Sequence, residues 1–164
     1  IWGPGDPHFL PRLAAKARAG RLWLLKSDAL VDATYIDNAA HAHLLAAEKL
    51  AGNAESVGGQ AFFIAQGEPL TAADMIIKLL AAISREPERL SVKGYLPARL
   101  GRAAGAALEK IWGFLALKSE PPLTAFVAEE LTLPHWFNLD RARRDLEYSP
   151  AVSLEEGLQY LRQS

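Results

Sequence analysis

The chain has 164 residues, half of them hydrophobic and 23% charged, which is typical of one folded globular domain. Its net charge of −1 and the lack of a basic stripe with interleaved aromatic residues argue against nucleic-acid binding. Cysteine is absent, which excludes disulfides, thiol catalysis and cysteine-based metal sites and fits a reducing compartment. No apolar run reaches the roughly 18–20 residues that a membrane span requires. We therefore expect a cytoplasmic protein.

The first 36 residues are predicted to form a turn, a helix and two short strands. Gly3 to Pro7 has the composition of a turn. Apolar residues at helical spacing predict a helix from Phe9 to Ala17, with Gly20 as its C-cap. Two strands are predicted to follow, a buried one at residues 22–25 and a second at residues 30–36.

The middle of the chain is predicted to form a helix, a strand and a second helix. Asp37 or Asn38 can cap the N-terminus of the first helix, which should end near Gly52. A strand is predicted at residues 60–65, and Thr71 opens the second helix in a motif like a capping box. The apolar face of the first helix is predicted to consist of Ala39, Ala40, His43, Leu44, Ala47 and Leu50.

The last part of the chain also alternates short strands and helices. Its predicted elements are, in order, a solvated loop at 85–89, a strand at 90–92, helices at 98–117 and 123–131, a strand-like piece at 135–137, a helix capped by Asp140 and a last helix opened by a capping box at Ser153. Long helices between short strands predict an α/β fold.

Several residues invite a chemical role, but a structural role explains them better. Trp23, Phe62 and Phe63 are predicted to lie in the core rather than to contact a cofactor. His41 and His43 are two residues apart and would point to different faces of a helix, so no metal ligands are assigned. The glycine pair at 101 and 105 permits close helix packing and is not a phosphate loop, because it lies within a helix.

The stretch from Leu96 to Leu117 is amphipathic. Arg99, Arg102 and Lys110 lie beside its apolar stripe, as in helices that lie on a membrane surface. A surface helix packed on the protein core through the same stripe is the alternative. The stripe consists of Leu96, Leu100, Ala103, Ala104, Ala107, Leu108, Ile111 and Leu115.

Three segments together resemble the C-terminal half of an extended short-chain dehydrogenase/reductase, on the 3β-hydroxysteroid dehydrogenase branch. They are Ile1-Trp2-Gly3-Pro4-Gly5-Asp6-Pro7, the segment from Leu30 to His43 with its Tyr35-Ile36-Asp37-Asn38-Ala39, and the segment from Asn138 to Pro150 that leads into Leu154-Glu155-Glu156-Gly157-Leu158. The resemblance implies a Rossmann-type α/β fold of short strands with several helices. It also implies that residues 1–164 form the substrate-binding half, and that the dinucleotide-binding half is absent from this chain.

Two motifs of the resembled family are missing. The chain has no Gly-x-x-Gly-x-x-Gly fingerprint for the dinucleotide. It also has no Tyr-x-x-x-Lys, since the residues four places after its tyrosines are Ala39, Arg99, Val152 and Ser164. No catalytic residue is therefore assigned, and the chain alone is expected to be inactive.

The resemblance implies binding residues around the first turn and the strand at 30–36. NAD or NADP would be bound mainly by the missing half, and its nicotinamide would lie beside the Gly-Pro-Gly turn. The implied cofactor contacts are Trp2, Gly3 and Pro4. The implied substrate contacts are Trp2, Phe9, Leu30, Val31, Thr34 and Tyr35.

Val31 indicates the class of substrate. Nucleotide-sugar members of the superfamily commonly carry an arginine at this place, where it binds the diphosphate. Valine removes that anion ligand and adds apolar surface. The resemblance therefore implies hydride exchange between a nicotinamide and the hydroxyl or ketone carbon of a hydrophobic substrate. A 3β-hydroxysteroid or sterol and a long-chain 2-alkyl-3-oxoalkanoate both remain open.

Two other functions stay open at this point. One is a fragment of a nucleotide-sugar epimerase or dehydratase, against which Val31 speaks. The other is a non-catalytic binding scaffold that kept the fold and lost the active half. Peripheral contact with a membrane surface and assembly into a homodimer are also left open.

Overall fold

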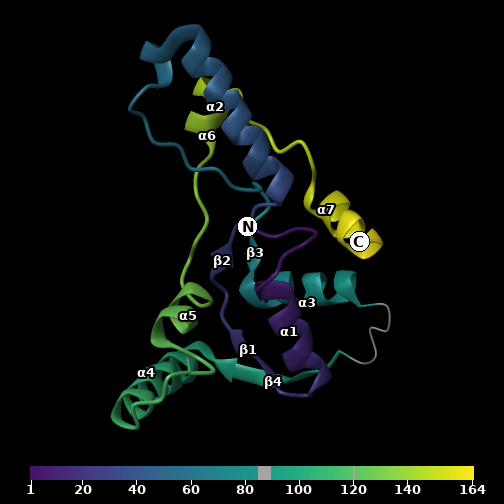
Figure 1. Cartoon of the computed structure of the whole chain (residues 1–164), viewed down its shortest axis with the longest axis vertical. Coiled ribbons are helices and arrows are strands. Elements are labelled where there is room, and N and C mark those ends of the chain that lie inside the picture. The colour runs from purple at the N-terminus through teal and green to yellow at the C-terminus, as the bar shows by residue number, and fades with distance from the viewer. Residues whose placement is uncertain (85–89, 120) are drawn as a thin grey trace. The chain divides into compact units, whose positions relative to one another are not determined.

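The computed structural model describes residues 1–84, 90–119 and 121–164 (Figure 1). The chain forms two compact units, each built from separate stretches of sequence. The first unit comprises residues 1–8, 32–69 and 136–164, and the second comprises residues 9–31 and 70–135. The loop predicted at 85–89 lies outside the described residues.

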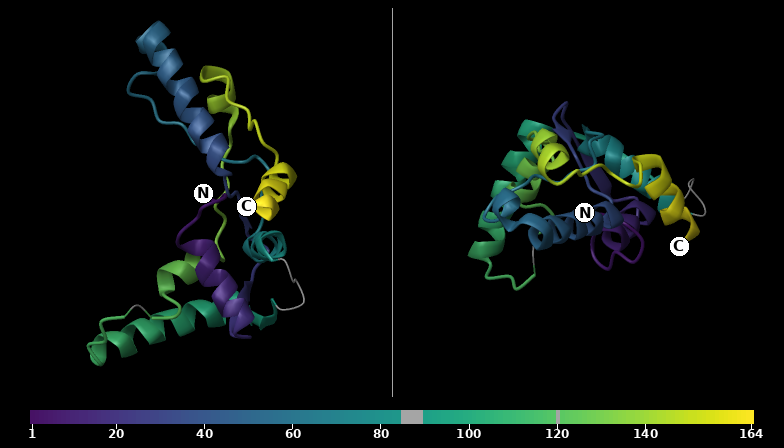
Figure 2. Two further views of the ribbon diagram at one scale, coloured as in Figure 1. Left: turned by 45° about the vertical axis from the view of Figure 1, so that its right-hand side comes forward. Right: turned by 90° about the horizontal axis from the view of Figure 1, so that it is seen from above.

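The second unit contains short strands joined by helices (Figure 2). β1 pairs in parallel with β4, with an irregularity between Leu22 and Trp23, and β2 pairs antiparallel with β3. Helices between parallel strands confirm the predicted α/β class. The elements are α1 (Phe9–Arg18), β1 (Leu22–Lys26), β2 (Leu30–Val31), β3 (Leu70–Thr71), α3 (Ala72–Ile83), β4 (Val92–Pro97), α4 (Ala98–Phe114) and α5 (Ala125–Glu130).

The core of the second unit joins α1, β1 and α3. The helix predicted from Phe9 is confirmed, and Gly20 follows it with a φ of 62°, a conformation that glycine adopts without strain. Thr71 caps α3 as predicted, because its hydroxyl accepts a hydrogen bond from the amide of Asp74. The core cluster consists of Leu13, Ala17, Leu22, Leu24, Ile76 and Leu80.

Two glycines let α4 pack closely against β1 and the residue before α5. A Cβ atom at Gly101 would lie 2.5 Å from Cδ2 of Leu25 in β1. A Cβ atom at Gly105 would lie 2.6 Å from the carbonyl oxygen of Thr124, just before α5. A Cβ atom would meet backbone at Gly105 and the end of the Leu25 side chain at Gly101, so the predicted role of the glycine pair in close packing is confirmed.

The first unit is built around three helices: α2 (Ile36–Val57), α6 (Asp140–Asp145) and α7 (Leu154–Gln163). α2 and α6 lie side by side in both figures. Ser153 opens α7 with the predicted capping box. The core of this unit consists of Ala42, Val57, Ala65, Leu139, Ala142, Leu146 and Tyr148.

The predicted N-cap of α2 is wrong, and its predicted buried face is right only in part. The helix begins at Ile36 with Tyr35 in the N-cap position, so Asn38 lies inside the first turn instead of capping it. Of the predicted face, Ala39 is buried whereas Leu44 is 64% exposed, and the helix also buries Ala42, which the prediction did not include. The predicted end near Gly52 is confirmed in part, since the helix is interrupted by non-helical backbone at Asn53.

The strand predicted at residues 60–65 is also wrong. The segment is irregular, and two of its carbonyls accept hydrogen bonds from side chains. The carbonyl of Ile64 accepts a hydrogen bond from Thr34, and that of Ala65 accepts one from the hydroxyl of Tyr148. The strand predicted at 30–36 is shorter than expected, with Leu30–Val31 paired as a strand and a single bridge at Tyr35.

Smaller differences concern capping and aromatic residues. Asp140 begins α6 and is not its cap, and the piece at 135–137 is reduced to one bridge between His135 and Val31. The core assignment of two aromatic residues is wrong, whereas Phe62 does pack against the first unit's core. Trp23 is exposed beside Lys93, and Phe63 is exposed and stacks on Phe137 at 4.1 Å.

Candidate functional site at a parallel strand edge

Trp2 and Tyr35 form a parallel bridge in the first unit. The amide of Trp2 donates to the carbonyl of Thr34 at 3.0 Å, and the amide of Ile36 donates to the carbonyl of Trp2 at 2.9 Å. A turn follows Trp2 directly, and α2 begins directly after Tyr35. The carboxyl ends of two parallel extended segments therefore lie together, which is the edge where α/β folds bind ligands.

Glycine is required in the turn after Trp2. A Cβ atom at Gly3 would lie 2.5 Å from Cγ2 of Ile36, so only glycine lets the turn approach the first residue of α2 this closely. Gly5 has a φ of 78°, and a Cβ atom there would meet nothing within 4 Å. The backbone at Gly5 is thus open to a neighbouring group.

The rings of Trp2 and Tyr35 are packed inside the unit. Their centroids are 5.1 Å apart in an edge-to-face arrangement, and Nε1 of Trp2 donates to the carbonyl of Ala33 at 2.9 Å. α7 covers the pair, since a Cβ atom at Gly157 would lie 2.9 Å from each ring. The two residues are only 3% and 2% exposed. Direct contact between these rings and a ligand stays a prediction.

A buried amide network fixes the strand that ends at Tyr35. Oε1 of Gln66 accepts hydrogen bonds from the amide of Tyr35 at 3.2 Å and from Nδ2 of Asn38 at 3.0 Å. Nε2 of Gln66 and Nδ2 of Asn38 both donate to the carbonyl of Val152 at 2.7 Å. The edge is therefore tied to the segments that precede β3 and α7.

Asp32 anchors the same segment from the other side. Its carboxylate accepts hydrogen bonds from the amides of Gln66 at 3.1 Å and Gly67 at 2.8 Å. Burial raises the pKa of Asp32 above its ordinary value, while backbone amides, including that of Glu68, act in the opposite direction. Burial also raises the pKa of Tyr35, with smaller effects from Asp37 and Tyr160.

The sequence-predicted site residues are divided between the two units. Trp2, Gly3 and Pro4 lie in the first unit at the strand edge, with Pro4 exposed and the other two buried. Thr34 and Tyr35 belong to the same edge and are buried. The other three belong to the second unit, namely Phe9 at the start of α1, which is exposed, and the half-buried pair Leu30 and Val31 of β2.

Sequence reasoning missed the residues that hold the edge together. The roles of Gln66 and Val152 depend on contacts to residues at least 28 positions away, which no local pattern encodes. Asn38 could have been recognised in the sequence, because a polar residue among alanines at a helix start needs a hydrogen-bond partner. Its partners, however, lie far away in the sequence and could not be identified from it. Among the described residues, no group of three or more acidic or histidine side chains could hold a metal ion.

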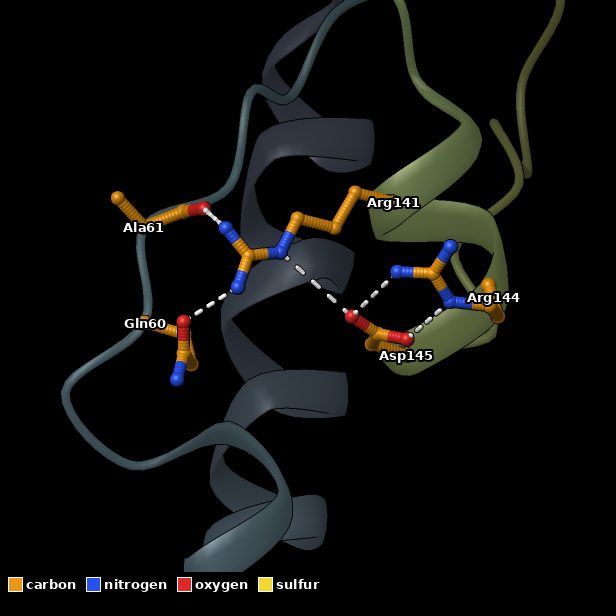
Figure 3. A network of polar contacts seen from close by, with 5 residues as sticks. All are labelled: Gln60, Ala61, Arg141, Arg144 and Asp145. Carbon is orange, nitrogen blue, oxygen red and sulfur yellow. Dashed lines mark hydrogen bonds and ion pairs between the residues drawn. The ribbon is translucent and has the colours of Figure 1, made fainter.

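A second polar network stabilises the far end of the first unit (Figure 3). Arg141 donates to the side chain of Gln60 and to the carbonyl of Ala61, and its Nε lies 3.6 Å from Asp145. Arg144 donates to both carboxylate oxygens of Asp145. These contacts tie α6 to the loop after α2 and assign no chemistry to it.

Comparisons with known proteins bear on the whole chain. A model of the 3-beta hydroxysteroid dehydrogenase/isomerase family matches residues 1–92. A 2-alkyl-3-oxoalkanoate reductase of Stenotrophomonas maltophilia is 48% identical over 100% of this chain and 48% of the relative. A decarboxylating sterol-4-alpha-carboxylate 3-dehydrogenase of Schizosaccharomyces pombe is 33% identical over 96% of this chain and 46% of the relative. The chain spans about half the length of the curated relatives it matches.

A solved structure supports the fold. The crystal structure of gox2253 superposes with a TM-score of 0.58 over 98% of this chain and 46% of that chain, at 17% identity. At this identity the likeness shows the fold alone. Since the family model covers more than half of the residues, the chain belongs to the 3-beta hydroxysteroid dehydrogenase/isomerase family.

Proposed function

We propose that this chain is the substrate-binding half of an NAD(P)-dependent oxidoreductase acting on the hydroxyl or ketone of a hydrophobic substrate. The observation that carries the proposal is the parallel edge formed by Trp2 and Tyr35, with a glycine turn directly after it. Ligands of α/β folds bind at such edges. Membership of a dehydrogenase family supplies the class of reaction.

The proposal assigns the dinucleotide-binding half to the rest of the whole protein. Its support is the length of the relatives, which is about twice that of this chain. A second support is the lack of both the glycine fingerprint and the Tyr-x-x-x-Lys in residues 1–164. In the whole protein, those two motifs would lie outside this chain.

A nicotinamide cofactor fits the turn through its backbone. When bound, the cofactor would supply or accept the hydride. Trp2, Gly3 and Pro4 would hold it, since Gly3 packs tightly on Ile36 and a Cβ atom at Gly5 in the same turn would meet nothing within 4 Å. The tight packing gives the turn a fixed position, which hydride transfer needs for alignment. NAD and NADP both fit this description.

Substrate contacts are proposed for Trp2, Phe9, Leu30, Val31, Thr34 and Tyr35. Val31 is the residue on which the proposed substrate class depends. Its side chain offers no hydrogen-bond donor to a diphosphate, and at this half-buried position it offers apolar surface. Tyr35 and Trp2 would contribute through the position of their backbone, given how little of their rings is exposed.

Sequence identity to the named relatives favours one of the two candidate substrates. The two reductases named for 2-alkyl-3-oxoalkanoates are 48% and 43% identical to this chain, whereas the yeast sterol-4-alpha-carboxylate dehydrogenase is 33% identical. We therefore propose a long-chain 2-alkyl-3-oxoalkanoate as substrate and keep a sterol as the second candidate. We further propose that the protein is cytoplasmic and contacts a membrane surface. We also propose that it forms a homodimer, which analytical ultracentrifugation would test.

The test uses the full-length protein that contains this chain. Oxidation of NADPH or NADH is followed by the loss of reduced-nicotinamide absorbance with three substrates, namely a 2-alkyl-3-oxoalkanoate, a 3-oxosteroid and a UDP-sugar. We expect turnover with the first. Turnover with the steroid alone would transfer the assignment to the second candidate.

Two outcomes would contradict the proposal. Micromolar binding of a UDP-sugar in calorimetry would support the epimerase or dehydratase reading. No binding of either nicotinamide cofactor by the folded full-length protein would support a non-catalytic scaffold.

A further inference from the structure

α2 leaves an apolar stripe uncovered along one side. Leu44 is 64% exposed and Leu50 is 47% exposed, and Ile36 at the first position of the helix is 42% exposed. The members of the stripe recur every three or four positions, so they share one side of the helix. We call this stripe the α2 face: Ile36, Ala40, His43, Leu44, Ala47 and Leu50.

The α2 face is not the side through which the helix packs on its own unit. The core of the first unit contacts Ala42, Leu45 and Ala46, which lie on a different side of the helix. His43 is the polar member of the α2 face, and its Nδ1 lies 2.8 Å from the carbonyl oxygen of Ala39. Because this hydrogen bond is made within the helix, a partner can cover the ring without leaving that nitrogen unsatisfied. A long apolar face of this kind marks a contact surface.

The α2 face begins at the strand edge formed by Trp2 and Tyr35. α2 follows Tyr35 directly, and Gly3 in the turn after Trp2 packs on Ile36. In α/β folds, the helix that follows a parallel strand packs back on the face of the same sheet. From Ile36 to Leu50 the helix rises about 21 Å, whereas the bridge between Trp2 and Tyr35 is isolated and joins one residue pair. α2 is therefore much longer than the piece of sheet at its start.

A second segment of the first unit also has the features of a strand that lacks its neighbour. Residues 60–65 have strand composition. The amide of Gln60 donates to the carbonyl of Val57, and the amide of Gln66 donates to Asp32. Within residues 1–84, 90–119 and 121–164, none of the amides of residues 61–65 between them donates a hydrogen bond. Free backbone amides in such a segment are a template for a further strand.

We propose that a β-sheet from the other half of the whole protein packs on the α2 face and pairs with residues 60–65. The length of the relatives supports this occupant, because the chain spans about half of it. Alanine at positions 40 and 47 lets a sheet approach the helix closely. The inference rests on the proposed function in one respect, since that function assigns the dinucleotide-binding half to the rest of the whole protein.

The same observations favour a sheet over other occupants. A second copy of this chain would cover the α2 face with another helix and would leave the amides of residues 61–65 without acceptors. A sheet accounts for both features at once. α2 comprises 22 residues. In the described part of the chain, no helix is long and apolar enough to cross a bilayer.

Cysteine labelling of the full-length protein tests the α2 face. Residues 1–164 contain no cysteine, so a cysteine introduced there can be followed by peptide mass spectrometry. Ala47 and Glu48 are neighbours that are both exposed in this structure, but they lie about 100° apart around the helix and only Ala47 belongs to the α2 face. We expect a maleimide to modify Ala47→Cys at least tenfold more slowly than the matched control Glu48→Cys.

Hydrogen exchange of the wild-type full-length protein tests the pairing of residues 61–65. Their amides should exchange at least tenfold more slowly than amides of an unstructured peptide of the same sequence, because a neighbouring strand would supply the acceptors. This measurement needs no substitution, so it decides the question even if a cysteine variant fails to fold. Circular dichroism checks the fold of both variants.

Three outcomes would overturn the inference. Equal modification of Ala47→Cys and Glu48→Cys in the folded protein is one, and free exchange of residues 61–65 is another. The third is protection of Ala47→Cys that disappears on dilution as a dimer dissociates in ultracentrifugation, which would assign the α2 face to a second copy.

Neither measurement uses a cofactor or a substrate, so the inference and the proposed function fail separately. Rapid modification of Ala47→Cys in a protein that oxidises NADPH or NADH would sink this inference and leave the proposed function standing. Protection of Ala47→Cys in a protein that binds no nicotinamide cofactor would do the reverse.

Discussion

Asn38 binds Val152 through both ends of its side-chain amide. Nδ2 donates to the carbonyl of Val152 at 2.7 Å, and Oδ1 accepts from the amide of Val152 at 2.9 Å. The asparagine is fully buried in the first turn of α2, 114 positions from its partner. This pair holds the segment before α7 against the strand edge.

Asn38→Ala should loosen α7 more than any other helix. The substitution leaves the amide of Val152 without its acceptor, and an unsatisfied buried group costs about 1–3 kcal/mol. In the full-length protein, hydrogen exchange of residues 153–163 should therefore accelerate, while exchange in α4 stays unchanged. Asn53→Ala, at an exposed position of α2, is the control. Equal effects of the two variants would mean that the Asn38 network does not hold α7.

Alanine should have opposite effects at two helical glycines. At Gly157 a Cβ atom would lie 2.9 Å from Trp2 and Tyr35, so overpacking should destabilise the first unit by about 1–3 kcal/mol. At Gly113 in α4 a Cβ atom would meet nothing within 4 Å, so better helix propensity should stabilise by roughly 0.5–1 kcal/mol. Urea denaturation measures both. A neutral Gly157→Ala would show that α7 does not lie tightly on the aromatic pair.

The carboxyl group of Asp145 should report its contact with Arg144. Hydrogen bonds from Arg144 hold the pKa of Asp145 below its ordinary value of 3.8. Because the folded-state pKa is the lower one, the contact stabilises the fold above pH 3.8 and is lost as the pH falls through the folded-state pKa. Arg144→Gln should therefore raise the pKa of Asp145 toward its ordinary value, as followed by NMR titration.

The control for this titration is a neighbouring exposed arginine. Nη1 of Arg143 lies 3.6 Å from Asp140, and Arg143→Gln should leave the pKa of Asp145 unchanged. A shift of the same size in both variants would mean that general charge, and not the Arg144 contact, sets the pKa.

Local patterns in the sequence predicted most helices of this fold. The caps at Thr71 and Ser153 use short-range hydrogen bonds, so residue type and spacing were enough. Strands were predicted less well, because a strand exists only where a partner strand supplies hydrogen bonds. Residues 60–65 have strand composition but bond to Thr34 and Tyr148 side chains instead.

The candidate site was predictable only in its outline. The turn after Trp2 was readable from its glycines, since their role depends on local backbone geometry. The burial of Trp2 and Tyr35 under α7 could not be predicted from the sequence, because Gly157 comes 122 positions after Tyr35. The exposure of Trp23 likewise reflects which side of β1 the unit covers.

Val31 should control the substrate class in the full-length protein. Val31→Arg would place a charge at a half-buried position, so turnover of an apolar ketone should fall, while Val31→Leu should preserve it. Steady-state kinetics with a 2-alkyl-3-oxoalkanoate compares the two variants. Unchanged turnover in Val31→Arg would remove Val31 from the proposed substrate contacts.

The most direct test of the strand edge is hydrogen exchange of the full-length protein with and without NADPH or NADH. If the edge carries the nicotinamide, cofactor binding should slow exchange in residues 1–8 and 33–38 and leave residues 98–114 of α4 unchanged. Saturating cofactor binding with no change in residues 1–8 and 33–38 would contradict the assignment.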